Sequence, residues 1–513
     1  MSRSQGDGGG HMTSGTGARE KTFFGHPSGL ATLFGTEMWE RFSWYGLRAI
    51  LATFMAASPA MGGLGLTQQT ATAVVGIYGA LIYLVALPGG WVADRILGAR
   101  RAVLWGGFII MCGHISMAIP VSTGAFVALG LLLIITGSGL LKPNISAMVG
   151  KLYPEDDDAR RDAGFSIFYL GINIGAFVAP LIVGWLAAGG RWHLGFSAAA
   201  VGMALGLTQY VLGRRHLRGV GDEPGHRLSP RERRHFALAL AVAVVVVGAV
   251  LAVWVASGTF DLDTFALAVT VIILIVPVAY FGYILFGSHN LTPGERSGMK
   301  AYIWLFVAAA IFWMLYDLAP TVLLFFAQDR TDLTLFGIRI TAATTQAFNP
   351  LFIALLVPVF AALWVKLGNR VTAPHKFVFA LFMNGLSFVV MALAAQLAAH
   401  GRISVWWLVL VYLVQVFGEL AMSPVGLSIT SKLAPQAFKG QMLGVWFIAI
   451  SVGDAVGGQT ARLKNYMSEP MYFLTLAGIA IAAAVVLFMF VGRLDAMIGE
   501  HHEEAASAGP AAS

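Results

Sequence analysis

The chain has 513 residues, of which 57% are hydrophobic and 12% are charged, whereas soluble domains carry about twice that charged fraction. Its apolar residues come in long blocks, which indicate membrane-spanning helices and not the short alternating strands of a membrane β-barrel. The net charge of +7 does not indicate nucleic-acid binding, because the basic residues lie mainly in connectors between the blocks. A single cysteine, Cys112, excludes an intrachain disulfide and a multi-cysteine metal site. We predict an all-α integral membrane protein.

The chain opens with a polar, Gly/Ser-rich segment, and we predict a disordered tail at residues 1–27 with no signal peptide before the first span. Fourteen apolar spans follow this tail. Their predicted ranges are 28–56, 69–94, 101–120, 123–151, 163–188, 193–214, 234–256, 262–286, 298–327, 341–367, 374–398, 403–433, 437–463 and 470–494.

The connectors between the spans differ in charge from one side of the membrane to the other. Those on one side hold 20 Lys and Arg residues, and those on the opposite side hold 6. Cytoplasmic connectors are enriched in Lys and Arg, and an even number of spans puts both termini on one side. We therefore expect a multi-pass protein of the plasma membrane, the inner membrane of the cell, with both termini in the cytoplasm.

The first span carries charges where a membrane helix normally has none. Each helical residue advances about 100°, so the polar and aromatic groups of this span share one face about 140° wide. A charge at the membrane centre costs roughly 2.5–3.5 kcal/mol, which favours a face that borders a protein interior or an aqueous cavity. The alternative is that Glu37 and Arg41 form an ion pair with a purely structural role, which only holds helices together. The residues of this face are Glu37, Glu40, Arg41, Trp44, Tyr45 and Arg48.

Later spans add ionisable and polar groups that could meet this face. Lys142 precedes Pro143, Asp317 precedes Pro320, and Glu419 precedes the Ser423-Pro424 break. Taken singly, the Lys142 side chain could extend to the membrane–water interface, and each acid could lie at that interface. Three such groups on separate spans instead favour a common cavity. Asn173 and Asn349 either line the same cavity or form hydrogen bonds between helices. By periodicity alone, Tyr83 and Trp446 are packing residues.

Two connectors suggest a duplicated core, because Leu-Gly-x-Arg occurs at residues 97–100 and again at 367–370. The first connector resembles a motif of the major facilitator superfamily, whose members are built from two repeated six-helix halves. Two of the fourteen spans are then extra, and we place them in a lipid-facing pair that is hydrophobic on all sides. The predicted domains are a tail at 1–27, a six-helix bundle at 28–214, a linker at 215–233, the inserted pair at 234–286, a linker at 287–297, a second six-helix bundle at 298–496 and a tail at 497–513.

Several motifs together resemble the proton-coupled oligopeptide transporter (POT/PTR2) family of that superfamily, in its bacterial form with fourteen helices. Residues 37–46 read EMWERFSWYG and resemble the family's first-helix pattern ExxER-F-x-Y-Y-G, and residues 168–175, FYLGINIG, resemble its fifth-helix signature. Further matches are Phe312-Trp313, Asn349-Pro350, Gly418-Glu419-Leu420 and Ser423-Pro424. The resemblance implies a major facilitator fold and proton-driven import of di- and tripeptides by alternating access.

The resemblance also implies roles for the residues named above. Arg48 and Lys142 would hold the peptide carboxylate, and Glu419, Asn173 and Asn349 would hold its amino end. The pocket would be lined by Tyr45, Tyr83 and Trp446. The proton-coupling group would comprise Glu37, Glu40, Arg41, Lys142 and Asp317, with Asp317 in place of the family's usual Glu and paired with Arg48.

Two positions depart from the family pattern. Trp44 replaces the first tyrosine of the pair, which suggests an altered side-chain preference and adds Trp44 to the substrate-binding residues. The run at 318–320, Leu-Ala-Pro, replaces a more polar run and makes the local gating geometry uncertain. Three other functions stay open: a transporter of nitrate or another small anion, a membrane enzyme and a non-transporting sensor. We expect a monomer without a metal or other cofactor, with protons as coupling ions and a di- or tripeptide as substrate.

Overall fold

The computed structural model describes residues 22–120, 124–154, 157–225, 227–287 and 291–507. These residues contain fifteen α-helices, and fourteen of them, all except α10, match the fourteen predicted spans. The helices are α1 (Ser28–Ala56), α2 (Gln68–Val92), α3 (Ala99–Ala118), α4 (Gly124–Gly150), α5 (Asp158–Ala187), α6 (Trp192–Gly213), α7 (Pro230–Ala256), α8 (Leu262–Gly282), α9 (Pro293–Tyr316), α10 (Leu324–Arg330), α11 (Phe348–Leu367), α12 (Ala373–Ala398), α13 (Trp406–Lys432), α14 (Lys439–Thr460) and α15 (Glu469–Ser507).

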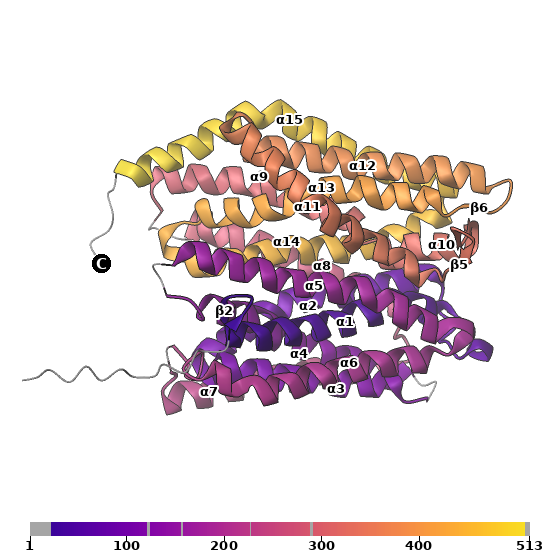
Figure 1. Ribbon diagram of the computed structural model, residues 1–513, viewed down its shortest axis with the longest axis horizontal. Coiled ribbons are helices and arrows are strands. Elements are labelled where there is room, and N and C mark those ends of the chain that lie inside the picture. The colour runs from indigo at the N-terminus through magenta and orange to yellow at the C-terminus, as the bar shows by residue number, and fades with distance from the viewer. Residues whose placement is uncertain (1–21, 121–123, 155–156, 226, 288–290, 508–513) are drawn as a thin grey trace, which may run out of the picture.

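The helices form two groups that lie side by side, α1–α6 below and α9–α15 above in Figure 1, with their axes along the length of the molecule. The described chain begins and ends at the same end of these groups, which is the left end in Figure 1. Three two-stranded sheets join short connecting segments. They pair β1 (Thr22–Phe23) with β2 (His26–Pro27), β3 (Thr331–Asp332) with β6 (Ile403–Ser404), and β4 (Thr334–Leu335) with β5 (Ile338–Arg339).

Twelve helices within the described residues are long and apolar enough to cross a membrane, so the protein is a multi-pass membrane protein. Two further helices, α1 and α14, are of similar length but do not meet that criterion. The charges of Glu37, Glu40, Arg41 and Arg48 interrupt the apolar run of α1, and polar residues with Asp454 interrupt that of α14. Both helices thus carry ionisable groups in the interior of the protein, where Glu37, Glu40, Arg41, Arg48 and Asp454 are buried.

The ends of the chain differ in part from the predicted tails. Residues 1–21 and 508–513 of these tails lie outside the described residues. Residues 22–27, which we assigned to the N-terminal tail, form the β1–β2 hairpin, and Phe23 packs on Phe34 of α1 with ring centroids 5.6 Å apart. At the other end α15 continues to Ser507, past residue 496, and His501 is buried because it packs on Gly298 of α9.

The helices α7 and α8 occupy the place of the predicted inserted pair. No residue of α7 is buried, as expected for a helix surrounded by lipid. One face of α8 is buried, and Thr270 on that face accepts a hydrogen bond from Gln459 of α14 at 3.0 Å. Asp261 caps the start of α8, where hydrogen bonds from the Thr264 N–H and hydroxyl lower the pKa of its carboxyl group. A second contact at this turn is the ion pair of Asp263 with Arg462 at 3.3 Å.

The predicted ninth span is broken inside the C-terminal group. Helix α9 ends at Tyr316, Asp317 follows as its C-cap, and the chain then passes through a π-helical turn at Ala319–Leu323 into α10. Pro320 explains the break, because proline cannot donate the backbone hydrogen bond that would continue the helix. The break places Asp317 at a helix end inside the molecule, next to the N-terminal group.

Candidate functional site

A cavity of about 170 Å³ lies between the two groups of helices. Its walls come from α1, α2 and α5 on one side and from α9, α11 and α13 on the other. Of the predicted site residues, eight line it. They are Trp44, Tyr45, Arg48, Tyr83, Asn173, Asp317, Asn349 and Glu419.

One wall of the cavity is built around the ion pair of Arg48 and Asp317. Nη2 of Arg48 lies 2.9 Å from Oδ1 of Asp317, and the two side chains are 7% and 12% exposed. Arg48 belongs to α1 and Asp317 to the end of α9, so this pair joins the two groups of helices. An ion pair this far from water is strong only while both partners stay charged and in place, which makes it a contact that protonation can break.

Three cations surround the indole of Trp44 in α1. Nζ of Lys142 lies 4.5 Å from the ring centroid, and the guanidinium carbons of Arg48 and Arg41 lie at 4.9 Å and 5.6 Å. Lys142 also lies 5.0 Å from the ring centroid of Tyr83. Cations at such distances are attracted by the negative ring face, so the aromatic residues help to hold like charges together, with Arg48 at the cavity and Arg41 and Lys142 behind it.

The opposite wall carries a hydrogen-bonded cluster centred on Glu419 of α13. The hydroxyl of Tyr316 donates a hydrogen bond to Glu419 Oε2. The amide of Asn349 at the start of α11 donates to the hydroxyl of Tyr316 at 2.6 Å and to Glu419 Oε2 at 3.3 Å. Three helices of the C-terminal group thus present one carboxylate to the cavity, held by neutral donors and, within the described part of the chain, paired with no cation.

The first-span acids form a separate cluster nearer the start of α1. Arg41 is paired with Glu37 at 2.9 Å and with Glu40 at 2.6 Å, and all three residues are buried. Nζ of Lys142 is buried near them without a hydrogen-bond acceptor among the described residues. These four residues do not line the cavity, so the structure divides the predicted common site into a cavity and a buried ionic cluster behind it.

For Trp446 and Asn173 the structure agrees with only part of what was expected: Trp446 is a packing residue, as its periodicity indicates, and not a pocket residue, as the family resemblance implies. Trp446 is 3% exposed, packs near Phe377 with ring centroids 6.4 Å apart, and does not line the cavity. Its indole also occupies the space beside Gly426, where a Cβ would overlap it. Asn173 does line the cavity, but its amide donates to the Tyr169 carbonyl of its own helix at 2.9 Å.

The structure adds residues to this region that the sequence did not single out. Tyr316 binds Glu419 and lines the cavity beside Gln346 and Gln415. Asp454 of α14 lies near Arg48 and Asp317 around a second, much smaller cavity. An acid in the middle of the predicted span 437–463 was the available signal for Asp454, the same signal that singled out Asp317 and Glu419.

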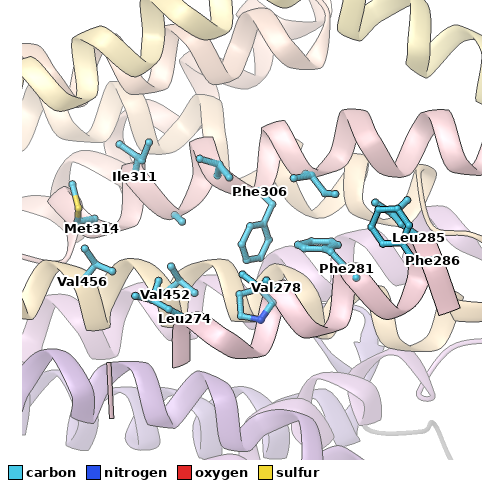
Figure 2. Close-up of a pocket in the computed structure, with 15 residues that line it drawn as sticks. Leu274, Val278, Phe281, Leu285, Phe286, Phe306, Ile311, Met314, Val452 and Val456 are labelled. Atoms are coloured by element: carbon cyan, nitrogen blue, oxygen red, sulfur yellow. The ribbon is translucent and has the colours of Figure 1, made fainter. Parts of the chain in front are cut away.

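A larger hollow of about 610 Å³ lies at the lipid-facing side, between α8, α9 and α14 (Figure 2). Its labelled side chains are all apolar and include Phe281, Phe306 and Val452. The described residues that line this hollow include no charged group to bind a polar molecule, so the smaller cavity between the two groups of helices, lined by Arg48, Asp317 and Glu419, is the candidate functional site.

Two helical bundles that enclose a cavity lined by charged side chains, next to a broken helix, have the architecture of a secondary transporter. A family model described as the POT family (PTR2) matches residues 100–489. The chain therefore belongs to the POT family.

Individual relatives cover nearly the whole chain. It is 44% identical to a di-/tripeptide transporter of Lactococcus lactis subsp. lactis (strain IL1403), with 94% of this chain and 98% of the relative covered. It is 43% identical to the uncharacterized transporter YclF of Bacillus subtilis (strain 168), in a match that covers 92% of this chain and 94% of that protein. The crystal structure of the peptide transporter POT in complex with sulfate matches with a TM-score of 0.89 and 45% identity, and the match covers 93% of this chain and 97% of that one. These matches confirm the predicted family, its major facilitator fold and a transporter instead of an enzyme.

Proposed function

We propose that this chain is a proton-coupled symporter that imports di- and tripeptides across the plasma membrane by alternating access. The observation that carries the proposal is the placement of Arg48 and Glu419 on opposite walls of one cavity. A peptide with free ends carries a carboxylate and an ammonium group several ångströms apart, and each is recognised by charge-assisted hydrogen bonds. The name of the Lactococcus relative, a di-/tripeptide transporter, supports the same class of substrate.

The two ends of the peptide bind to different bundles in this proposal. Arg48 binds the carboxylate, and Lys142 adds positive charge from behind Trp44. Glu419 binds the ammonium group, and Asn349 and Asn173 supply further polar contacts. Since one end is bound by α1 and the other by α11 and α13, a bound peptide links the two bundles and couples its own position to their movement.

The described state is contracted around its cavity. Ligand cavities of proteins usually enclose about 300–1,000 Å³, whereas this one encloses about 170 Å³. Several polar contacts between the bundles lie at the end opposite to the termini, including Gln68 with Asp329 at 2.9 Å and Gln69 with Asn465 at 3.1 Å. With cytoplasmic termini, as the charge bias of the connectors favours, these contacts close the external face.

Proton coupling uses the ion pair between the bundles. A carboxylate paired with arginine is held ionised, and protonation removes the charge that holds the pair together. Protonation of Asp317 therefore releases Arg48 for the peptide carboxylate and weakens the closed external face. Glu37, Glu40, Arg41 and Lys142 form the second ionisable group of this coupling, because Lys142 interacts with both the glutamates and Arg48.

The proposal is tested by uptake of a labelled dipeptide into proteoliposomes with and without an inward proton gradient. We expect uphill accumulation only with the gradient, and displacement of bound label by unlabelled dipeptide but not by nitrate. Uptake at the same rate without a gradient would leave a facilitator, and displacement by nitrate would favour an anion transporter. Because one chain contains both bundles, we also propose that the active species is a monomer.

The substitution Asp317→Asn tests the coupling step separately. We expect it to lower gradient-driven accumulation by roughly 5- to 150-fold, the range that corresponds to a coupling free energy of about 1–3 kcal/mol. Exchange of labelled for unlabelled dipeptide at equal pH on both sides needs no net proton transport, so it should persist. Full uphill accumulation by this variant would show that Asp317 has no part in coupling.

A further inference from the structure

Asp454 of α14 is a buried acid next to the ion pair of the two bundles. Its residue is 3% exposed, and neither carboxylate oxygen has a hydrogen-bond partner among the described residues. With Arg48 and Asp317 it lines a cavity of about 10 Å³. Buried polar groups are normally hydrogen-bonded. A buried acid without a hydrogen-bond partner is therefore expected to bind a ligand or to carry a proton.

Close packing of α2 on α14 brings this acid to Arg48. A Cβ at Gly79 of α2 would lie 2.5 Å from Oδ2 of Asp454 and 3.7 Å from Nη2 of Arg48. One turn earlier, a Cβ at Gly76 would lie 2.6 Å from the backbone oxygen of Asp454. The absence of side chains at these two positions lets the carboxylate and the guanidinium approach the same point from different helices.

The neighbouring hydroxyl groups do not satisfy the carboxylate of Asp454. Thr72 of α2 and Thr321 after the helix break line the same cavity. Their hydroxyls donate to backbone carbonyls of their own segments instead, at 2.7 Å to Gln68 and at 3.2 Å to Leu318.

The neighbouring charges do not balance it either. Arg48 already pairs with Asp317 at 2.9 Å. The other charged group that acts on Asp454 is Lys142 of α4, which lies over the rings of Trp44 and Tyr83 and beside the first-span glutamates. One guanidinium thus faces two carboxylates, and an uncompensated buried carboxylate is strongly disfavoured relative to its protonated form.

We propose that Asp317 and Asp454 form a carboxylate pair that holds one proton beside Arg48 in the closed state. A second proton enters on the carboxylate bound to Arg48, forms an O–H bond there and releases the guanidinium to the peptide; it later leaves to water on the other side of the membrane. Close carboxylates share protons and titrate as one unit. The pair deepens the proposed function and rests on it, because its second proton is the coupling proton.

The size of the small cavity excludes any ligand larger than about one water molecule. A single water needs roughly 10–15 Å³ of such space, and this cavity has about 10 Å³. A peptide group or a hydrated metal cation is too large for it. A proton needs no space of its own, and either carboxylate can hold it while the other pairs with Arg48.

The test compares Asp317→Asn, Asp454→Asn and the double variant in proteoliposomes. Asparagine keeps the size of aspartate, and size-exclusion chromatography with dipeptide exchange checks that each variant is folded. Because either acid alone can pair with Arg48, we expect each single variant to lose only part of its gradient-driven accumulation, within the range of roughly 5- to 150-fold given above, and the double variant to fall to the level without a gradient. For a pair titrating in two steps, exchange at equal pH on both sides should show two transitions in the wild type and one in Asp454→Asn.

A matched control is Ser451→Ala, one turn from Asp454 in α14, whose hydroxyl donates to the Ala80 carbonyl of α2 at 2.8 Å. It loosens the same helix contact without removing an acid, so the two transitions should persist.

Different outcomes separate the pair from the proposed function. If Asp317→Asn alone abolishes gradient-driven accumulation and Asp454→Asn keeps two transitions, the pair is overturned while peptide transport stands. A sodium gradient that drives accumulation at fixed pH through Asp454 would also overturn it, in favour of a metal cation. Absence of dipeptide exchange by the wild type would overturn the proposed function itself.

Discussion

Trp44 lies where the buried cationic groups of the site meet. The ring contacts Lys142, Arg48 and Arg41 at centroid distances of 4.5–5.6 Å, is 2% exposed and packs edge-on against Tyr45. Its indole is a better partner for a cation than a phenol or benzene ring is. The tryptophan, at a position where the sequence comparison suggests a tyrosine, therefore helps to hold the cations of Lys142, Arg48 and Arg41 together, and in the proposed function this positive charge would face the peptide carboxylate.

The substitution Trp44→Leu tests this role. Loss of the ring face leaves three like charges without their shared partner, and a cation–π contact contributes about 0.5–2 kcal/mol. We expect the KM for a dipeptide to rise by roughly 2- to 30-fold, as that energy implies, in proteoliposome uptake. Trp44→Phe keeps a weaker ring face and should fall between leucine and the wild type. Equal KM values for all three proteins would show that the ring serves only as packing.

At the scale of residues, local patterns predicted contacts within a helix better than contacts between helices. Arg41 pairs with Glu37, as their spacing of four residues on one helix face indicates. The expectation for Arg48 and Asp317 came from the family resemblance, and the 2.9 Å contact is now part of the structure. Periodicity indicated that Trp446 is a packing residue, as the structure shows, but it could not place Tyr316 in the cavity, because which side of a membrane helix faces a cavity depends on its packing partners.

At the scale of elements, the linker after α6 docks on the turn between α2 and α3. Arg100 pairs with the carboxylate of Asp222, and its N–H donates to the Gly221 carbonyl at 3.0 Å. Gly98 makes this turn with φ of 80° and ψ of 148°, a backbone region that residues with a side chain rarely adopt. The linker is thereby tied to the N-terminal bundle at the point where the chain leaves it.

The substitution Gly98→Ala is expected to lower the thermal stability of the purified protein. Backbone strain of this kind costs about 1–3 kcal/mol, and the new Cβ would lie 2.9 Å from the carbonyl oxygen of Asp222. Gly225→Ala in the same linker is the control, because a Cβ there meets nothing within 4 Å. Unfolding followed by intrinsic fluorescence should give a lower Tm for Gly98→Ala only; identical Tm values would mean that the linker adapts.

The positions of the helices follow closely from hydrophobicity, and their interruptions less so. The first predicted span, 28–56, coincides with α1. The ninth, predicted as continuous over 298–327, is divided at Asp317 because Pro320 breaks the backbone hydrogen bonding. The last helix runs thirteen residues beyond the predicted end of its span at 494, to Ser507, since length inside a membrane does not limit a helix that continues into water.

At the scale of the whole molecule, the two bundles meet through features that no single span reveals. Gln68 and Asp329 are 261 positions apart in the sequence yet share a hydrogen bond at the end opposite to the termini, and Arg48 reaches Asp317 across the same interface. Hydropathy orders the helices along the chain but does not say which ones face each other. The contacts that close one end of the cavity therefore became visible only in the structure.

The side of the membrane on which these contacts lie is still a prediction, and accessibility of cysteines tests it. Phe336, at the tip of the β4–β5 hairpin, is 83% exposed, and Gly225 lies in the linker at the opposite end of the helices. With Cys112 replaced by alanine, we expect Phe336→Cys to react with a membrane-impermeant maleimide in intact cells and Gly225→Cys to react only after permeabilisation. Those results follow if the end with 20 basic connector residues is cytoplasmic. The reverse pattern would turn the closed face inward, and the resting state would then be open to the outside.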